Sequence, residues 1–489
     1  MKILYYSDFG AVGDGVTDDM EAIVRTHEAA NKAGVGVCAD SNAVYYIGGA
    51  NRTAIIQTPT DWRGAKFIID DTEVEDSGNI LFKVMSKQAP VEISAIQSFK
   101  KNQGQLDIRL PYDALMYAVN KNVVLYKREG LNVNQGEAQS DVFILRKDGL
   151  IDGDCAPVWD FDEVSALTAY PIDDEVLTIR GGFFTTLANR AKNEYRYFFR
   201  GITVMRSRVV FDGIIHTVEK ESDHGSPYNG FITFNRCTDC VVQNAEFTAH
   251  RTYTTIGSAG LPVQMGSYDL LANYSVNLLY KNCRQLNDIC DTRFWGIFSS
   301  NGCKNITMDG VVFSRFDAHK GTVNPVIKNS TIGHMGIKLI GSGTCLLENT
   351  KVLGSHFVEF RPDYGSTWDG EIIIRNCEYT PLNLAQRGTL LFHTWYSGQH
   401  DFGYPCFMPR KIIIDGLVIH DESPPEGYSG PYIFNNLHPN YDDASYVATY
   451  PYTLIKALEI KRLTAKSGKP WVLSKNKDLF KDLCLIEAE

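Results

Sequence analysis

The chain has 489 residues, 44% of them hydrophobic, and a formal net charge of −10 at pH 7. Its length allows a large buried core, and its acidic balance argues against a general nucleic-acid binder, which normally carries a basic domain or stripe. This charge is still compatible with an anionic glycan bound in a locally basic groove.

The first residues predict where the protein is located. Residues 1–6 (Met-Lys-Ile-Leu-Tyr-Tyr) enter strand-like sequence at once, without the pattern of a secretory signal. The sequence also has no apolar run of membrane length. We therefore expect a cytoplasmic protein or, alternatively, a component of a phage virion, with no membrane contact.

A helix is predicted to follow the acidic segment 8–19 and to end near Ala33. Thr17 or Asp18 can cap its first turn, and its apolar face contains Met20, Ile23, Val24 and His27. Such a helix would cover the open end of a β-solenoid, whose first coil otherwise exposes its core and unpaired backbone groups.

Segment 8–19 (Asp-Phe-Gly-Ala-Val-Gly-Asp-Gly-Val-Thr-Asp-Asp) closely resembles the opening of the pectate-lyase/polygalacturonase-like superfamily of right-handed β-helices. That superfamily includes many phage tailspike depolymerases. The resemblance implies the fold and a poly- or oligosaccharide partner but does not fix the reaction. It also makes a homo-oligomer possible, a trimer if the protein comes from a phage.

Three regions are expected along the chain. A first rung is predicted at residues 64–70, whereas the coil pattern disappears from about 72 to 174, where runs such as 141–145 predict an inserted β-rich module. The coil pattern resumes at residues 176–182. The predicted domains are therefore 1–71 (cap and first rung), 72–174 (inserted module) and 175–489 (main parallel β-helix with a C-terminal cap).

An asparagine or aspartate closes one short apolar run after another in the second half of the chain. The spacings between these residues range from 20 to 39. A minimum repeat length with variable insertions is typical of a solenoid, and short β-branched runs indicate strands. The predicted fold is an all-β, right-handed parallel β-helix. The recurring residues are Asp212, Asn244, Asn282, Asp309, Asn329, Asn349, Asn376 and Asp415.

The residues six positions after each recurring Asn or Asp are predicted to form one column of side chains. From Asn244 onward the column reads His250, Asp288, Arg315, Met335 and Ser355. Ionisable groups stacked one rung apart are costly in a core and suit the face of a groove. A ladder of ion pairs that serves only the fold is the alternative interpretation.

Short blocks in this region are similar to the active-site rungs of polygalacturonases. They are residues 317–319 (Asp-Ala-His), 332–341 and 358–361 (Val-Glu-Phe-Arg). The resemblance implies that Asp317 matches the first of two catalytic aspartates, His334 the histidine, and Arg361 the final lysine. This chain departs from the pattern at Ala318, at Glu359 and at Arg293, so the positions at which the family has its catalytic bases hold other residues.

The leading hypothesis from the sequence is a glycoside hydrolase. Asp317 would be the general acid, Asp288 or Asp291 the base or nucleophile, and His319 and His334 would tune them. Trp295, Trp368 and Trp395 are candidate stacking platforms. The remaining substrate-binding candidates are His250, Arg293, Arg315, Lys338, Glu359 and Arg361.

Two other functions are also open. A metal-independent polysaccharide lyase would use Arg293 or Arg315 to neutralise a uronate and His319 or His334 as the base. A non-catalytic phage tail or surface protein would only bind glycan. No cofactor and no metal are expected, since Cys237 and Cys240 form a lone C-x-x-C and several of the eleven cysteines stand singly, which favours reduced thiols.

Overall fold

A computed structural model describes residues 3–191, 196–222 and 225–488. The chain divides into two compact units. Unit 1 comprises Met1–Val119, Ser140–Asp288 and Arg293–Phe298, and unit 2 comprises Asn120–Gln139, Ile289–Thr292 and Ser299–Glu489.

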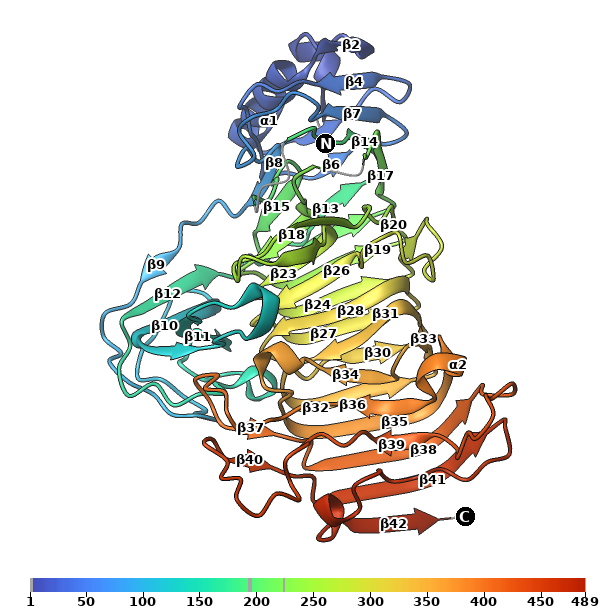
Figure 1. Cartoon of the computed structure of the whole chain (residues 1–489). Helices are drawn as coiled ribbons and strands as arrows, with labels where there is room; N and C mark the ends of the chain where they lie inside the picture. Colours follow the sequence, from blue (N-terminus) through green and yellow to red (C-terminus); the bar gives the residue numbers. More distant parts are fainter. Residues whose placement is uncertain (1–2, 192–195, 223–224, 489) are drawn as a thin grey trace. The chain divides into compact units, whose positions relative to one another are not determined.

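Unit 1 is a coil of parallel strands stacked in three columns (Figure 1). The first column contains β1 (Ile3–Tyr5), β3 (Gly36–Cys38), β6 (Thr60–Asp61), β13 (Leu177–Arg180), β16 (Val209–Asp212), β19 (Thr238–Gln243) and β24 (Val276–Lys281). The second contains β2 (Asp14–Asp18), β4 (Val44–Ile47), β7 (Lys66–Asp70), β14 (Phe183–Leu187), β17 (Ile215–Glu219), β20 (Glu246–Phe247) and β25 (Arg284–Gln285). The third contains β5 (Ala54–Ile56), β8 (Phe82–Met85), β15 (Ile202–Met205), β18 (Asn229–Asn235) and β23 (Tyr268–Asn273).

The coil of unit 1 is filled by residues that occupy the same position on successive rungs. Tyr45, Phe67 and Phe184 are register partners, and the rings of Phe67 and Phe184 stack with centroids 4.5 Å apart. Strands β7 and β14 alternate buried and more exposed side chains, so a rung buries its apolar face only against its neighbours. The coil begins at β1, earlier than the first rung predicted at residues 64–70.

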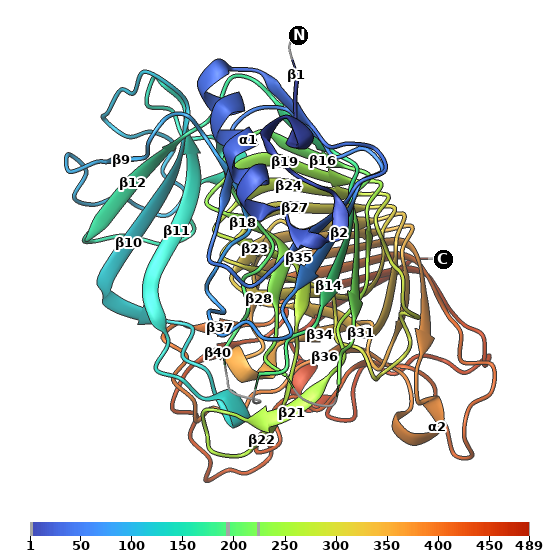
Figure 2. The same ribbon diagram turned by 90° about the horizontal axis from the view of Figure 1, so that it is seen from above.

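Helix α1 (Met20–Ala33) covers the end of the unit 1 coil, as predicted (Figures 1 and 2). Its face with Met20, Ile23 and His27 is buried, and the hydroxyl of Tyr6 lies 2.9 Å from Nε2 of His27. The N-cap position is Asp19, one or two residues later than predicted. Its carboxylate instead accepts hydrogen bonds from the backbone N–H groups of Val12 and Gly13.

The inserted β-rich module is present as a separate four-stranded sheet with the order β11-β10-β12-β9. Within unit 1, β10 pairs with β12 and β12 with β9, both antiparallel. Tyr117 packs against Tyr274, which follows β23 of the coil, with ring centroids 5.0 Å apart. The domain limits 72–174 stay a prediction. The strands are β9 (Val91–Glu92), β10 (Ala114–Leu125), β11 (Glu137–Leu145) and β12 (Ala166–Pro171).

Unit 2 is also a coil of parallel strands. Its first column contains β27 (Lys304–Asp309), β30 (Val326–Lys328), β32 (Gly341–Glu348), β35 (Trp368–Pro381), β38 (Lys411–Ile419), β41 (Ala457–Ala465) and β42 (Cys484–Ala488). In the second column β28 (Val312–Lys320) pairs with β31 (Thr331–Leu339), β31 with β33 (Lys351–Gly354), and β33 with the end of β35. The end of β31 also pairs with β34 (Val358–Phe360), which is followed by β36 (Leu390–His393) and β39 (Tyr432–Phe434).

The recurring residue marks a left-handed turn between strands. Asn244, Asn329 and Asn349 have positive φ, near 50°, and asparagine tolerates this conformation better than most other residues. Their side chains form ladders; the Asn329 amide donates to Asp309 Oδ1 at 2.8 Å. The right-handed parallel β-helix predicted from this repeat is the fold observed.

The column predicted from the residues six positions after each recurring Asn or Asp was wrong by one position in part of the chain. Where the recurring residue is aspartate, the following glycine takes the left-handed conformation, as at Gly310. Asp309 is therefore the register partner of Lys328, and not of Asn329. A register shift between Phe313 and Arg315 then moves the pairing by two residues in the opposite direction, so Arg315 pairs with Gly336 instead of Met335.

Among the described residues no disulfide is formed, and all of the eleven cysteines but Cys290 and Cys484 are buried. Among the residues that the structure describes, no helix combines the length and the apolar character needed to cross a bilayer.

Candidate functional site

Unit 2 places four ionisable side chains at the same position on four successive rungs. Asp317 on β28 pairs in register with Lys338 on β31, Lys338 with Glu359 on β34, and Glu359 with His393 on β36. Rungs are about 4.8 Å apart, so neighbouring charges in this column interact directly. Their strand neighbours, among them Phe316, Ile337, Leu339, Val358 and Phe360, are buried, so the four side chains point outward from the coil. We call these four residues the outer column.

Asp317 is nonetheless fully covered, with 0% of its surface exposed. Arg315 lies 2.6 Å from Oδ2, and one nitrogen of Arg361 lies 2.7 and 3.0 Å from the two carboxylate oxygens. Burial alone would raise the pKa of Asp317, but the charges of Arg315 and Arg361 outweigh it and lower the pKa.

The cover over Asp317 comes from a turn after β34 and from the tip of the inserted module, residues 120–139. Arg361 forms a fork with Asp363, whose Oδ2 is also 2.8 Å from Nε of Arg128 in that tip. Lys320 at the end of β28 pairs with Glu137. The charges of Arg361 and Arg128 hold the pKa of Asp363 at about 2, although its burial acts in the opposite direction.

His319 lies under the same cover. Its Nδ1 is 2.8 Å from Oδ1 of Asn301, and the hydroxyl of Tyr364 is 3.3 Å from its Nε2. Burial, together with the positive charges of Arg361 and Lys320, lowers the pKa of His319 well below its usual value. The ring is therefore neutral, donates to Asn301 and accepts from Tyr364.

The general-acid role predicted for Asp317 does not fit this geometry. A general acid must be protonated and must reach the leaving oxygen, whereas Asp317 is held ionised and has no exposed surface. The guanidinium groups of Arg315 and Arg361 are buried against carboxylates, so in this structure they do not face a substrate. This half of the predicted site is a buried ion-pair network.

The other half of the outer column is open to solvent. Lys338 and Glu359 are 23% and 24% exposed in their side chains, and Lys338 Nζ lies 3.3 Å from Glu359 Oε2. The rings of His356 and His393 stack 4.4 Å apart at an angle of 9°, and His356 Nδ1 is 3.9 Å from Oε2 of Glu359. Burial opposes the shift, but Lys338 and the two imidazoles lower the pKa of Glu359.

We call Lys338, His356, Glu359 and His393 the open cluster. The sequence singled out Lys338 and Glu359 but missed His393 as a member of the same column. The 33 residues between Glu359 and His393 include the long strand β35, loops and the short helix α2 (Leu384–Arg387), so no constant spacing reveals their register.

An exposed aromatic side chain follows the open cluster. Burial alternates from His393 to Trp395: His393 is partly exposed, Thr394 is buried, and Trp395 is 44% exposed. In extended chain this alternation places His393 and Trp395 on the same face. The backbone N–H of Trp395 donates to Ser366 Oγ at 2.9 Å, which fixes its position. By contrast, Trp368 is fully buried in the core.

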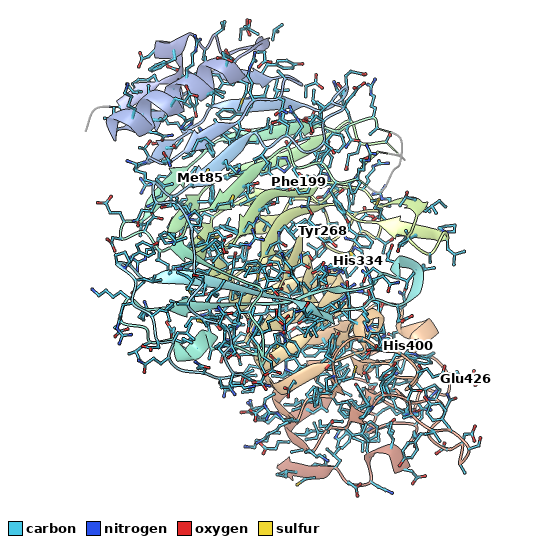
Figure 3. All side chains as sticks on the ribbon, turned by 90° about the vertical axis from the view of Figure 1, so that its left-hand side faces the viewer. Met85, Phe199, Tyr268, His334, His400 and Glu426 are labelled. Atoms are coloured by element: carbon cyan, nitrogen blue, oxygen red, sulfur yellow. The ribbon has the colours of Figure 1, made fainter. Side chains whose placement is uncertain are left out.

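His334 and Asp291 lie on other parts of unit 2. His334, labelled in Figure 3, is on β31, and its backbone N–H donates to the carbonyl of Ile289 at 2.9 Å. A Cβ on Gly333 would come within 2.1 Å of the same carbonyl, so glycine is needed for this approach. Asp291 belongs to the short segment 289–292 that this contact anchors, and it is partly exposed.

His250 belongs to a buried network in unit 1. Its Nδ1 donates to Glu221 at 2.9 Å and its Nε2 to Asp269 at 3.0 Å, while the second oxygen of Asp269 accepts from His216 at 2.9 Å. His216 Nε2 lies 2.9 Å from the hydroxyl of Thr186. His250 is 1% exposed, so it does not line an exposed wall as predicted.

The ion pairs of this network decide the charge of His250. Burial disfavours the imidazolium, but Glu221 and Asp269 outweigh burial and raise the pKa of His250 to about 10. Both ring nitrogens therefore carry protons that are already donated to carboxylates. The arrangement stabilises the fold and leaves His250 no lone pair for a substrate.

The remaining predicted residues also lie in unit 1. Trp295 is partly exposed, donates its backbone N–H to the carbonyl of His250 at 2.8 Å, and packs so closely on Gly266 that a Cβ there would clash with its ring. Arg293 and Asp288 are exposed. The structure thus brings together Arg315, Asp317, His319, Lys338, Glu359 and Arg361 in unit 2, whereas His250, Asp288, Arg293 and Trp295 belong to unit 1.

Comparison with known proteins gives the fold. No family model and no curated protein sequence matches the chain. Among solved structures, it is similar to tailspike gp61 of Pseudomonas phage phi297, with a TM-score of 0.59, 14% identity, and coverage of 99% of this chain and 84% of that one. It is also similar to tailspike gp49 of Pseudomonas phage LKA1, with a TM-score of 0.57, 13% identity, and coverage of 94% and 81%.

A third similar structure contains a sugar. It is the Gp54 tailspike of Acinetobacter baumannii bacteriophage AP22 in complex with A. baumannii capsular saccharide, with a TM-score of 0.53, 9% identity, and coverage of 99% of this chain and 79% of that one. At these identities the three likenesses show that the chain shares the parallel β-helix fold of these tailspikes.

Proposed function

We propose that the chain binds an acidic polysaccharide across the open cluster and Trp395 of unit 2, and cleaves it. The observation that carries the proposal is the register of Lys338, Glu359 and His393, which gathers a cation, a carboxylate and imidazoles on one outward face. An exposed tryptophan beside such a group suits stacking on a sugar ring. A capsular saccharide bound to the Gp54 tailspike, which has the same fold, supports this substrate class.

The groups of the open cluster suit β-elimination better than hydrolysis. Elimination beside a uronate needs a cation to neutralise the carboxylate and a base to accept the proton. Lys338 supplies the cation, and the imidazole of His356 or His393 takes the proton from the carbon beside the carboxylate. The bond to the glycosidic oxygen breaks as the carbon–carbon double bond forms, and the leaving oxygen takes a proton from water. A polysaccharide lyase is therefore the proposed reaction.

Hydrolysis is the second candidate function. It requires one protonated carboxyl group and one carboxylate about 5–9.5 Å apart. Asp317 and Glu359 occupy the same column two rungs apart, but the pKa of each is lowered. A hydrolase would need substrate binding to expose and protonate one of them, and this is why elimination ranks first.

A screen of purified protein against acidic and neutral polysaccharides tests the proposal. Reducing ends together with the ultraviolet absorbance of an unsaturated sugar would support the lyase, whereas reducing ends without that absorbance would support the hydrolase. Retention on a glycan without any cleavage would reject the enzyme and leave a binding protein. No interaction with any glycan would contradict the proposal as a whole.

The oligomeric state is part of the same proposal. If the chain acts as a phage tailspike, a homotrimer is expected, and sedimentation of the purified protein measures this directly. A monomer that cleaves glycan would separate the enzymatic function from the virion.

A further inference from the structure

The open cluster also contains a set of metal-binding atoms. His356, Glu359 and His393 each offer one ligand atom, and these atoms lie within 4.8 Å of one another. All three side chains are partly exposed, so an ion could enter without opening the core. This group was not expected from the sequence, in which the three residues show no short ligand motif.

The backbone fixes the three residues relative to each other. Glu359 lies within β34 and His393 ends β36, as register partners on adjacent rungs, while His356 lies three residues before Glu359. The stacked rings of His356 and His393 bring the two imidazoles to the same side of Glu359. Ligand atoms of a tetrahedral Zn²⁺ are roughly 3.4 Å apart, given Zn–N and Zn–O distances of about 2.0–2.2 Å. Since imidazole lone pairs lie in the ring plane, the two stacked rings must rotate out of the stack to converge on one ion.

We propose that His356, Glu359 and His393 form a binding site for a divalent transition-metal ion such as Zn²⁺, with a coordination position open to solvent. Two imidazoles and one carboxylate are typical ligands of Zn²⁺, Ni²⁺ and Cu²⁺. Mg²⁺ and Ca²⁺ prefer sets of oxygen ligands and are not expected to bind.

Lys338 limits the affinity of this site. Its ammonium group lies 3.3 Å from Glu359 Oε2, so it shares the carboxylate and repels a second cation. Metal coordination and proton abstraction would need the same imidazole lone pairs, so Zn²⁺ is expected to compete with the cleavage proposed above. The site itself does not depend on that cleavage, because its ligands are present without glycan.

Calorimetric titration of the glycan-free protein with Zn²⁺, after treatment with a chelator, tests the inference. We expect one equivalent of Zn²⁺ to bind to the wild type. Glu359→Gln and His393→Ala each remove a ligand, and should weaken binding by more than the roughly 10–100-fold that loss of an outer-shell partner costs. Lys338→Met removes the repulsion and should tighten binding by about tenfold.

His400→Ala is the matched control. His400, labelled in Figure 3, is a partly exposed histidine of unit 2 whose Nδ1 lies 3.7 Å from Glu129. This pair contains one imidazole, whereas the proposed metal site contains two. Its removal should leave Zn²⁺ binding unchanged. Visible absorption of bound Co²⁺ and the melting temperature of each variant show whether the site or the fold has changed.

Two results would overturn the inference. One is wild-type Zn²⁺ affinity in both Glu359→Gln and His393→Ala. The other is weaker binding in Lys338→Met when its melting temperature is unchanged. Because no glycan is present, neither result depends on whether the chain is an enzyme.

Discussion

Unit 1 and unit 2 each contain a group in which two histidines lie beside an acidic side chain, yet the two groups differ in what surrounds them. In unit 1, His216, Asp269 and His250 are buried, and each proton of the His250 ring is donated to a carboxylate. In unit 2, His356, Glu359 and His393 are partly exposed beside Lys338. The same residue types are therefore enclosed in the core of unit 1 and form the site that we propose to be functional in unit 2. Solvent access and satisfied hydrogen bonds make the difference.

The largest expected effect is loss of stability when the buried network of unit 1 is broken. Asp269→Asn cannot accept hydrogen bonds from both His216 and His250, and it leaves the imidazolium of His250 with one fewer charge partner. We expect a decrease of about 3 kcal/mol in the free energy of unfolding, measured by denaturant titration. A decrease below about 1 kcal/mol would show that the network is not a main stabiliser of unit 1.

Removing the carboxylate of Glu359 in unit 2 should instead strongly reduce activity and hardly change stability. Glu359→Gln is expected to reduce the rate of glycan cleavage by about 100-fold or more, because it disturbs the groups that bind and transfer protons. The free energy of unfolding should change by less than about 1 kcal/mol, since the Lys338 pair is partly exposed.

Glu378→Gln is the control for Glu359→Gln. Glu378 is a partly exposed glutamate of unit 2 that lies 3.2 Å from both Lys351 and His420, so it has the same kinds of neighbours outside the open cluster. The Glu378→Gln variant should cleave glycan at the wild-type rate. Equal loss of activity in both variants would argue against a localised site.

The pH dependence of stability tests whether His250 of unit 1 is held as an imidazolium. The folded-state pKa of His250, about 10, lies above its ordinary value of 6.5. Its ion pairs therefore contribute fully below about pH 6.5, and this contribution is lost as the pH rises toward 10. The melting temperature of the wild type should fall between pH 7 and pH 10 more steeply than that of His250→Gln. Parallel profiles would show that His250 is not held as an imidazolium.

The smallest expected effect is on glycan affinity. Trp395→Ala removes an exposed ring beside the open cluster and should weaken glycan binding by about three- to tenfold, measured by calorimetry. Phe183→Ala in unit 1 removes a ring of similar exposure, 43%, and should leave the affinity unchanged. If Phe183→Ala weakens binding more than Trp395→Ala does, the glycan lies on unit 1 instead.

The fold could be predicted from the sequence because its signal is local and repeated. A residue that tolerates the left-handed conformation must end each strand, and Asn244, Asn329 and Asn349 meet this need at a visible position. Register is harder, since an Asp-Gly pair such as Asp309-Gly310 moves the turn to the glycine. One residue of error turns a side chain from the outer face to the core.

The candidate site was less predictable because burial and long insertions decide it. Asp317 and Lys338 are neighbours in one column, but residues 120–139 cover only the first, and nothing near Asp317 in the sequence reveals this cover. His393 was missed because the number of residues between it and Glu359 depends on the lengths of the intervening loops and not on the repeat. A sequence can show that ionisable groups share a face, whereas their access to solvent depends on segments far away in the chain.

Hydrogen–deuterium exchange with a glycan selected by the screen tests most directly whether the open cluster is the functional site. We predict that bound glycan protects residues 331–339, 358–360 and 390–395 in unit 2, and leaves the exchange of residues 246–273 in unit 1 unchanged. Protection confined to unit 1, or no change in those three segments under saturating glycan, would contradict the account.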